Sequence, residues 1–463
     1  MVAPRKMTFY GLRDIEKISQ LNNLSEEEKF DIKVVANVLP FRTNNYVVEE
    51  LIDWDNIPDD PIFQLTFPQK GMLSENQFNR MAEVLMNTNA SKEQIREVSH
   101  EIRLELNPHP AGQMTLNVPS LDDEPVPGVQ HKYKETCLVF PSSGQTCHAY
   151  CTFCFRWAQF VGINDLKFAT DESNRFQAYL LKHKEITDVL FTGGDPMVMT
   201  LPKLRTYIEP LLGPDFEHIS NIRIGTKAVS YWPYRFINDK DSEGILKLFE
   251  DVVKSGKHLA IMGHYNHWVE LTTEPAQEAI RRIRNTGAQI RTQSPLIKHV
   301  NDDSEVWARL WKDQVNLGLI PYYFFVERNT GAKEYFSIPL AEAYEIFRNA
   351  FTKVSGLSRT VRGPSMSALP GKVAVEGVTE VRGEKVFVLN FIQGRNPEWN
   401  KRPFFAKYDP EANWLTDLRP AFGKDKFFYQ DELNELIRSN FGQMYFHTDD
   451  DTGMEIDVEM VEE

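Results

Sequence analysis

Residues 146–156 read TCHAYCTFCFR, and this segment decides the fold. It carries three of the chain's four cysteines, Cys147, Cys151 and Cys154. The segment comes shortly after Thr136–Phe140, an apolar run that is typical of a buried strand. Because thiolates on one short loop suit zinc and the iron of iron–sulfur clusters, the segment predicts a metal centre at the end of that strand.

The ligand count leaves three interpretations of these cysteines open. Three thiolates on a four-iron cluster leave one iron without a protein ligand, and a cofactor or substrate can bind there. A structural zinc normally has four ligands, which would require His148 or another side chain. Coincidental spacing is the third interpretation. The fourth cysteine, Cys137, lies inside the predicted strand and is expected to be a buried apolar residue.

The rest of the central region alternates short apolar runs with amphipathic stretches, a pattern that is typical of βα repeats. The predicted strands are Thr136–Phe140, Asp188–Thr192, Ile219–Gly225, His258–Gly263, Gln289–Gln293 and Ile320–Val326. The predicted helices include Ser173–Lys182, Gly244–Val253 and Pro275–Asn285. Strands with helical crossovers predict an α/β fold with a parallel sheet, arranged as a partial (β/α)6 barrel. Its functional groups are expected at the C-terminal ends of the strands.

The flanking segments predict further units. Ser74–Met86 and Ser91–Leu106 carry apolar residues at helical spacing. Val373–Thr379 and Val386–Phe391 predict a hairpin around Arg382-Gly383. We expect a helical N-terminal region at 1–133, the barrel at 134–355, an α+β extension at 356–447 and an acidic tail at 448–463. The tail carries eight acids and no base, so we expect it to be solvated, with a lid or an oligomer contact as the alternative.

Composition limits the classes of function. The 463 residues include 52 Lys and Arg against 66 Asp and Glu, a net charge of −14 that argues against broad nucleic-acid binding. The sequence has no run of about 18 apolar residues, and its start has no apolar signal core. Four cysteines in so long a chain do not form a secreted disulfide framework. We therefore expect a cytoplasmic protein without membrane or nucleic-acid partners.

The cysteine spacing resembles the cluster motif of radical S-adenosylmethionine enzymes, and the surrounding residues resemble the lysine 2,3-aminomutase family. The matching segments, in chain order, are Asp59-Asp60-Pro61, Pro125-Val126-Pro127-Gly128, His131 with Tyr133, the cysteines, Thr192–Pro196, Arg223-Ile224-Gly225, His264–His267, Gln293-Ser294, Val300–Asp302 and Pro321–Tyr323. The resemblance covers residues 57–375. It implies an isomerase with a [4Fe-4S] cluster on the three cysteines, S-adenosylmethionine on the open iron, and an external electron donor of the flavodoxin or ferredoxin type.

The resemblance also implies contacts to S-adenosylmethionine. Gly193, Gly194 and Asp195 end the second predicted strand, where two glycines admit the methionine part and a carboxylate can accept from its ammonium. An ordinary βα turn is the alternative. His264 and Gln293 end the fourth and fifth predicted strands and are implied contacts of the same cofactor. The alternative is that both are satisfied polar groups near the core.

Aminomutases of this family also use pyridoxal phosphate bonded to a lysine, and Lys372 is the candidate here. Tyr133 matches the family's phosphate-binding tyrosine. The family's run of glycines before the lysine is reduced to Gly371, and its arginine three residues after the tyrosine is Thr136. A lysine at the edge of a hairpin is therefore the alternative.

Three arginines bear on the substrate. Arg156 stands where the family uses an arginine for the substrate carboxylate, and a surface arginine is the alternative. Lysine-specific members hold the distant ammonium with two aspartates, and the matching positions are Arg328 and Arg362. This charge reversal predicts an amino acid with an anionic side chain, such as glutamate. As the alternative, these arginines bind a pyridoxal or peptide phosphate or face solvent.

We therefore predict an aminomutase that moves an α-amino group to the β-carbon of a free amino acid. One alternative is a radical enzyme without pyridoxal phosphate that abstracts hydrogen and catalyses an elimination, an oxidation or another rearrangement. Another is a noncatalytic iron–sulfur or zinc protein. The family's C-terminal zinc site is absent, since no cysteine follows Cys154. A homo-oligomeric assembly is left open.

Overall fold

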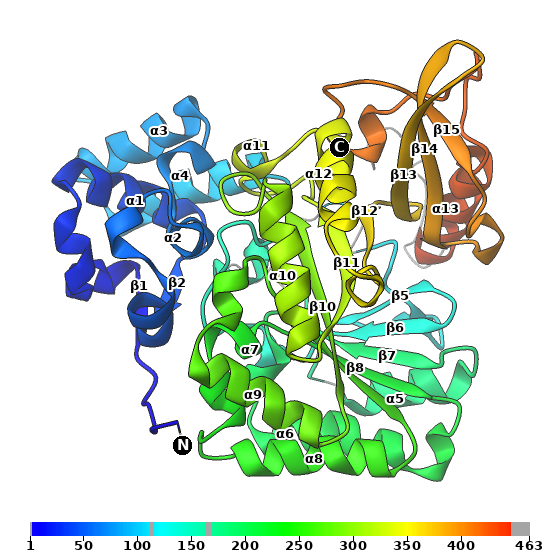
Figure 1. Cartoon of the computed structure of the whole chain (residues 1–463), viewed down its shortest axis with the longest axis horizontal. Coiled ribbons are helices and arrows are strands. Elements are labelled where there is room, and N and C mark those ends of the chain that lie inside the picture. Colours follow the sequence, from blue (N-terminus) through cyan, green and yellow to red (C-terminus); the bar gives the residue numbers. More distant parts are fainter. Residues whose placement is uncertain (1, 109, 111–114, 163–167, 172, 446–463) are drawn as a thin grey trace.

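The computed structural model describes residues 2–108, 110, 115–162, 168–171 and 173–445, with side chains up to 438. A large sheet with its covering helices lies between a helical N-terminal unit and a C-terminal hairpin unit (Figure 1). The expected α/β class is therefore confirmed. The predicted acidic tail, 448–463, lies outside the described residues.

Within the described residues, the central sheet has eleven strands that lie side by side in chain order. They are β5 (Val129–Tyr133), β6 (Thr136–Val139), β7 (Asp188–Phe191), β8 (Asn221–Thr226), β9 (His258–His264), β10 (Gln289–Leu296), β11 (Ile320–Val326), β12 (Arg362–Ser367), β13 (Gly371–Val381), β14 (Glu384–Gly394) and β15 (Phe404–Lys407). Neighbours from β6 to β12 pair in parallel. The pair β5–β6 and the pairs from β12 to β15 are antiparallel. Each parallel crossover therefore returns to the adjacent position in the sheet.

Helices cover one face of the parallel strands (Figure 1). In chain order they are α5 (Ser173–Lys182), α6 (Leu201–Ile208), α7 (Ala228–Tyr231), α8 (Ser242–Lys254), α9 (Glu274–Asn285), α10 (Ser304–Asn316) and α12 (Leu340–Thr352). Helix α11 (Lys333–Phe336) instead packs Phe336 into the core of the N-terminal unit. In α8, Ile245, Leu248 and Val252 recur at helical spacing and are buried. They share one core with Ile222 and Ile224 of β8, which fixes the helices on that face.

Alternation along the strands sends polar side chains to the opposite face. In β8, Ile222 and Ile224 are buried against the helices, whereas Arg223 between them is half-buried on the other face. In β6, Cys137 is fully buried in the helix-facing core, which confirms the expectation for this residue. The polar side chains of the strands therefore collect on the face away from the helices.

The N-terminal unit packs against the cysteine segment. Its elements are β1 (Phe9–Gly11), α1 (Glu26–Val38), β2 (Arg42–Asn44), α2 (Pro61–Thr66), α3 (Glu75–Met86), α4 (Lys92–Glu105), β3 (Ser120–Leu121) and β4 (Glu124–Pro125). Ser74 and Ser91 cap α3 and α4 through reciprocal capping boxes, which confirms these predicted helix starts. The core of the unit joins Phe63 to Phe153, a residue of the cysteine segment.

The C-terminal strands extend the central sheet. The hairpin β13–β14 turns at Arg382 and Gly383, whose φ values of 54° and 81° suit a tight hairpin turn. Helix α13 (Gln430–Tyr445) packs Leu433 and Ile437 into the core of this unit. The units predicted at 1–133 and 356–447 therefore share a sheet with the predicted barrel, the first through β5 and the second through β12 to β15.

Some elements extend beyond the predicted bounds. Strand β10 continues to Leu296, so Gln293 lies inside the strand, and β9 includes His264. Helices α10 and α12 were not among the predicted elements, although Trp307 and Trp311 of α10 have helical spacing and are buried. No described helix is long and apolar enough to cross a membrane.

Candidate active site

The cysteine segment follows β6 as a loop, and the N-terminal unit holds it in place. The Arg42 guanidinium donates to the Thr146 hydroxyl at 2.7 Å, and the Arg42 carbonyl accepts from the Tyr150 N–H at 2.8 Å. The Asn44 amide donates to the His148 carbonyl at 3.0 Å. These bonds join residues that are about a hundred positions apart in the sequence, and they fix the backbone on both sides of Cys147.

The three half-buried thiols lie close enough for their charges to act on one another. Desolvation raises the pKa of Cys151 to about 11 and that of Cys154 to about 12. Within the described part of the chain, no three His, Cys, Asp or Glu side chains form a group that could hold a single metal ion. Three thiolate donors on one loop fit a multi-iron cluster with one open iron, whereas a structural zinc needs a fourth ligand. His148 is buried and its Nδ1 lies 4.0 Å from an Asp195 oxygen.

Gly193 and Gly194 bring the end of β7 against the start of this loop. Gly193 has a φ of 139°, which favours glycine. A Cβ at Gly194 would collide with the Thr146 backbone, and the Asp195 N–H donates to the Thr146 carbonyl at 2.7 Å. The two glycines therefore form a close backbone approach directly beside the cysteines.

The Asp195 carboxylate has several protein partners. It accepts from the Thr226 hydroxyl at 2.7 Å, from the Met197 N–H at 2.8 Å, and from the Lys227 and Ala228 N–H groups at 2.9 and 3.1 Å. The residue is 2% exposed, and desolvation raises its pKa to about 6. The turn after β8 therefore supplies donors to both oxygens, and acceptance of a hydrogen bond from a cofactor ammonium by Asp195 stays a prediction.

His264 and Gln293 are paired residues on β9 and β10. The His264 ring stacks on Phe153 of the cysteine loop, with ring centroids 5.8 Å apart and an interplanar angle of 18°. The Nδ1 of His264 is buried and has no hydrogen-bond partner among the described residues. Desolvation holds the pKa of His264 well below its usual value, so the ring is neutral. The structure therefore brings both predicted residues to the sheet end that carries the cysteine loop.

Arg156 and Arg328 lie over the same ring, that of Phe155, at 5.0 and 4.8 Å from its centroid. Desolvation, and then the neighbouring Arg328 charge, lower the pKa of Arg156 to about 9. Arg328 donates to the Ser367 carbonyl at 3.0 Å, but its buried Nε finds no partner in the described chain. Arg328 therefore has a donor to spare for an anion beside Arg156.

Lys372 and Arg362 share a second ring. The Lys372 Nζ and the Arg362 Cζ lie 4.0 and 4.3 Å from the Tyr323 ring centroid. Desolvation, and then the Arg223 charge, lower the pKa of Lys372 to about 7. The Nη2 of Arg362 is buried and without a partner among the residues described. Desolvation raises the pKa of Tyr133, whose hydroxyl interacts electrostatically with Tyr323.

The structure adds residues that sequence reasoning missed. Lys132 donates to the Ala368 carbonyl, and Arg395 donates to Asn117 Oδ1 at 2.5 Å. The charges of Arg395, Arg328 and Lys372 all act on Lys132, so these four basic side chains occupy one region. Glu327 is a buried acid beside them, and desolvation holds its pKa well above the usual value. Lys132 and Glu327 adjoin predicted residues in sequence, whereas nothing in the sequence pointed to Arg395.

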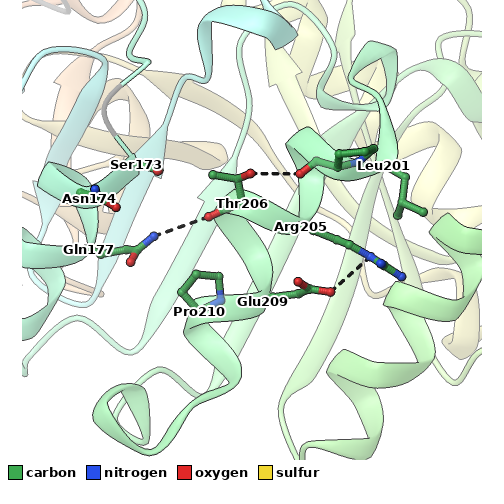
Figure 2. Close-up of a pocket in the computed structure, with 9 residues that line it drawn as sticks. Ser173, Asn174, Gln177, Leu201, Arg205, Thr206, Glu209 and Pro210 are labelled. Atoms are coloured by element: carbon green, nitrogen blue, oxygen red, sulfur yellow. Dashed lines mark hydrogen bonds and ion pairs between the residues drawn. The ribbon is translucent and has the colours of Figure 1, made fainter.

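A surface pocket lies apart from this site, between α5 and α6 (Figure 2). Gln177 of α5 donates to the Thr206 carbonyl at 3.5 Å, and Arg205 pairs with Glu209 at 3.2 Å. The pocket is lined by Ser173, Asn174, Gln177, Leu201, Pro202, Arg205, Thr206, Glu209 and Pro210. None of these lining residues belongs to the predicted site.

Sequence relatives, rather than a family model, show which family the chain belongs to. No family model matches it. It is 31% identical over 407 residues to a protein of Aquifex aeolicus (strain VF5) provisionally named L-lysine 2,3-aminomutase, a match that covers 88% of this chain and 95% of the relative. It is 25% identical over 384 residues to the L-lysine 2,3-aminomutase of Bacillus subtilis (strain 168), covering 82% of this chain and 71% of the relative.

Among solved structures, a radical SAM methyltransferase from Sphaerobacter thermophilus aligns with a TM-score of 0.36 and 16% sequence identity. The alignment covers 50% of this chain and 68% of that chain, and the structural similarity is too low to support an argument. The loop of three cysteines on an α/β sheet and the sequence relatives together define the class, a radical S-adenosylmethionine enzyme. Within that class the chain belongs to the lysine 2,3-aminomutase family and is an enzyme of the aminomutase type. Its relatives imply a [4Fe-4S] cluster and S-adenosylmethionine as cofactors.

Proposed function

We propose that this enzyme moves the α-amino group of a free amino acid with an anionic side chain to the β-carbon, with glutamate as the simplest substrate. One observation carries the proposal. Arg328 and Arg362 present buried N–H groups without partners in the described chain. Arg362 shares the Tyr323 ring with the candidate lysine, Lys372, and the charges of Arg328 and Lys372 both act on Lys132. Charged donors in a desolvated site are stabilised by an anion.

The cluster belongs, in this proposal, on Cys147, Cys151 and Cys154, at the mouth of a partial (β/α)6 barrel formed by β6 to β11. The backbone of Gly193 and Gly194, with His264 and Gln293, would hold S-adenosylmethionine. Asp195 would position the turn beside it, since its oxygens bind Thr226 and nearby N–H groups. When bound, these groups supply the radical chemistry, and an external flavodoxin- or ferredoxin-type donor supplies the electron.

Pyridoxal phosphate is proposed to bind covalently to Lys372, with Tyr133 near its phosphate. A pKa of about 7 leaves a large fraction of the Lys372 amine neutral at neutral pH, and the neutral amine is the nucleophile. When bound, this cofactor supplies a route for nitrogen between adjacent carbons. Its presence would explain why a lysine is held on the ring of Tyr323 among arginines.

The substrate carboxylates are proposed to bind the arginines. Arg156 and Arg328 lie over one ring and can hold one carboxylate between them, while Arg362 lies beside Lys372. A lysine side chain would bring an ammonium toward these guanidinium groups and meet repulsion. The expected discrimination therefore favours acidic amino acids over L-lysine.

The test is an amino-acid panel. Protein reconstituted anaerobically is incubated with each amino acid, and β-amino products are detected by mass spectrometry. We expect product from L-glutamate or a relative, a loss of at least 100-fold in kcat/KM in Arg328→Ala, and little change in Arg348→Ala, which removes an exposed arginine. Turnover of L-lysine that is undiminished when Arg328 and Arg362 are both changed to Ala would contradict the proposal.

A radical enzyme without pyridoxal phosphate is the second candidate, because Thr136 replaces the expected arginine and only Gly371 precedes the lysine. The two candidates differ in a spectrum. Pyridoxal phosphate bonded to a lysine absorbs visible light. This absorbance should appear in wild-type protein with pyridoxal phosphate and be missing in Lys372→Ala.

A further inference from the structure

Tyr231 is a buried residue beside the cysteine loop that the proposed function does not use. It is the last residue of α7 and is 1% exposed. The Cys151 thiol donates to the Tyr231 hydroxyl oxygen at 3.8 Å. When a cluster replaces the thiol proton, the Tyr231 hydroxyl is left as the donor of this pair. The Tyr231 carbonyl accepts from the same Asn44 amide that holds the His148 carbonyl, so tyrosine and loop are fixed relative to each other.

Lys227 places a positive charge on the ring of this tyrosine. Its Nζ lies 4.3 Å from the Tyr231 ring centroid, with the side chain 10% exposed. Asn266 Oδ1 at 3.0 Å and Glu270 at 2.5 Å hold the ammonium there. A cation over the face of a phenol withdraws electron density, which makes the O–H a stronger hydrogen-bond donor. Lys227 is therefore placed to act on Cys151 through Tyr231.

We propose that Tyr231, supported by Lys227, donates a hydrogen bond to the Cys151 thiolate and thereby sets the reduction potential of the cluster. This inference rests on the proposed cluster at the three cysteines. Reduction by one electron makes the cluster more negative, so a donor to its sulfur stabilises the reduced form and raises the potential. The electron comes from a low-potential external donor, and no covalent bond of the protein changes.

The Tyr231 hydroxyl forms a hydrogen bond with one of the three cluster cysteines, Cys151. Among side chains in the described chain, Tyr231 is the one whose hydrogen bond reaches the sulfur of a cluster cysteine. Arg42, by contrast, donates to the Thr146 hydroxyl and, at 3.4 Å, to the Cys147 carbonyl. The proposed effect on the reduction potential therefore acts through Cys151 rather than through the whole cysteine loop.

The test compares two conservative variants. Tyr231→Phe removes the hydroxyl and keeps the ring. Tyr265→Phe is the matched control, because Tyr265 is also fully buried and its hydroxyl lacks a partner among the described residues. Each protein is reconstituted, its iron and sulfide are counted, and its midpoint potential is measured by EPR during a mediated redox titration. We expect full loading of both, a more negative potential for Tyr231→Phe, and an unchanged potential for Tyr265→Phe.

Loaded Tyr231→Phe with the wild-type potential would overturn the inference, as would an equal shift in Tyr265→Phe. If Tyr231→Phe holds no cluster, Lys227→Met combined with Glu270→Gln removes the cation and keeps the tyrosine. We expect a smaller negative shift there, and no shift would count against the inference. Wild-type protein that takes up no cluster would instead contradict the proposed function, so the two failures are distinguishable.

Discussion

At the scale of single residues, the site concentrates cations. Arg156 and Arg328 share the Phe155 ring, while Arg362 and Lys372 share the Tyr323 ring. Desolvated like charges raise the free energy of the folded protein unless an anion or an aromatic face compensates them. The pKa values respond in the expected direction, because desolvation lowers those of Arg156 and Lys372.

The lowered pKa of Lys372 predicts a pH dependence for its reaction with pyridoxal phosphate. Only the neutral amine reacts, so a pKa lowered to about 7 means that the reactive fraction rises through pH 7 and levels off above about pH 8. The measurement is the initial rate of gain in visible absorbance between pH 6 and 10. Arg362→Ala removes a neighbouring positive charge and should move the midpoint upward, whereas Arg348→Ala should leave it in place. A rate that keeps rising to pH 10 in wild-type protein would disagree with this account.

At the scale of elements, the N-terminal unit completes the site. The cysteine loop packs Phe153 into the core of that unit, and β2 supplies Arg42 and Asn44 to the loop backbone. Asn44 is fully buried. Its amide donates to the His148 and Tyr231 carbonyls, and its Oδ1 accepts from the Tyr46 and Val47 N–H groups. One side chain thus joins β2, the cysteine loop and α7.

Asn44→Ala should therefore damage both stability and cluster loading. Loss of this amide leaves several buried backbone groups without partners, at a cost of about 3 kcal/mol or more. Urea unfolding and iron content per chain measure the two effects. The control is Asn45→Ala, which removes two solvent-exposed hydrogen bonds, from the Thr8 N–H and to the Lys6 carbonyl, and should cost about 1 kcal/mol or less. Equal stability and iron content in the two variants would show that the loop does not depend on Asn44.

At the scale of the whole molecule, the sequence allowed prediction of what depends on local pattern. Apolar runs such as Ile320–Val326 located the strands, and the cysteines after β6 were correctly placed in a loop at the strand end. Contacts between distant segments escaped prediction. Arg156 meets Arg328 only through the folded sheet, and the Asp195 carboxylate binds a turn about thirty residues further on. Spacing carries no information on such pairs, because they depend on how strands and loops converge.

The continuous sheet is the other feature that local pattern could not predict. The hairpin β13–β14 was predicted as part of a separate extension, but β12 pairs in parallel with β11 and carries the hairpin onto the same sheet. This pairing brings Lys372 of β13 beside Tyr323 of β11. The C-terminal unit therefore brings the candidate residue Lys372 to the candidate site.

The most direct test of the central claim follows nitrogen in the product. Protein loaded with iron, sulfide and pyridoxal phosphate is incubated anaerobically with S-adenosylmethionine, a low-potential reductant and L-glutamate labelled with 15N, and the products are analysed by NMR. The account predicts that 15N moves from the α- to the β-carbon in wild-type protein and stays in place in Lys372→Ala. Cleavage of S-adenosylmethionine without a β-amino product from glutamate or any other acidic amino acid would contradict it.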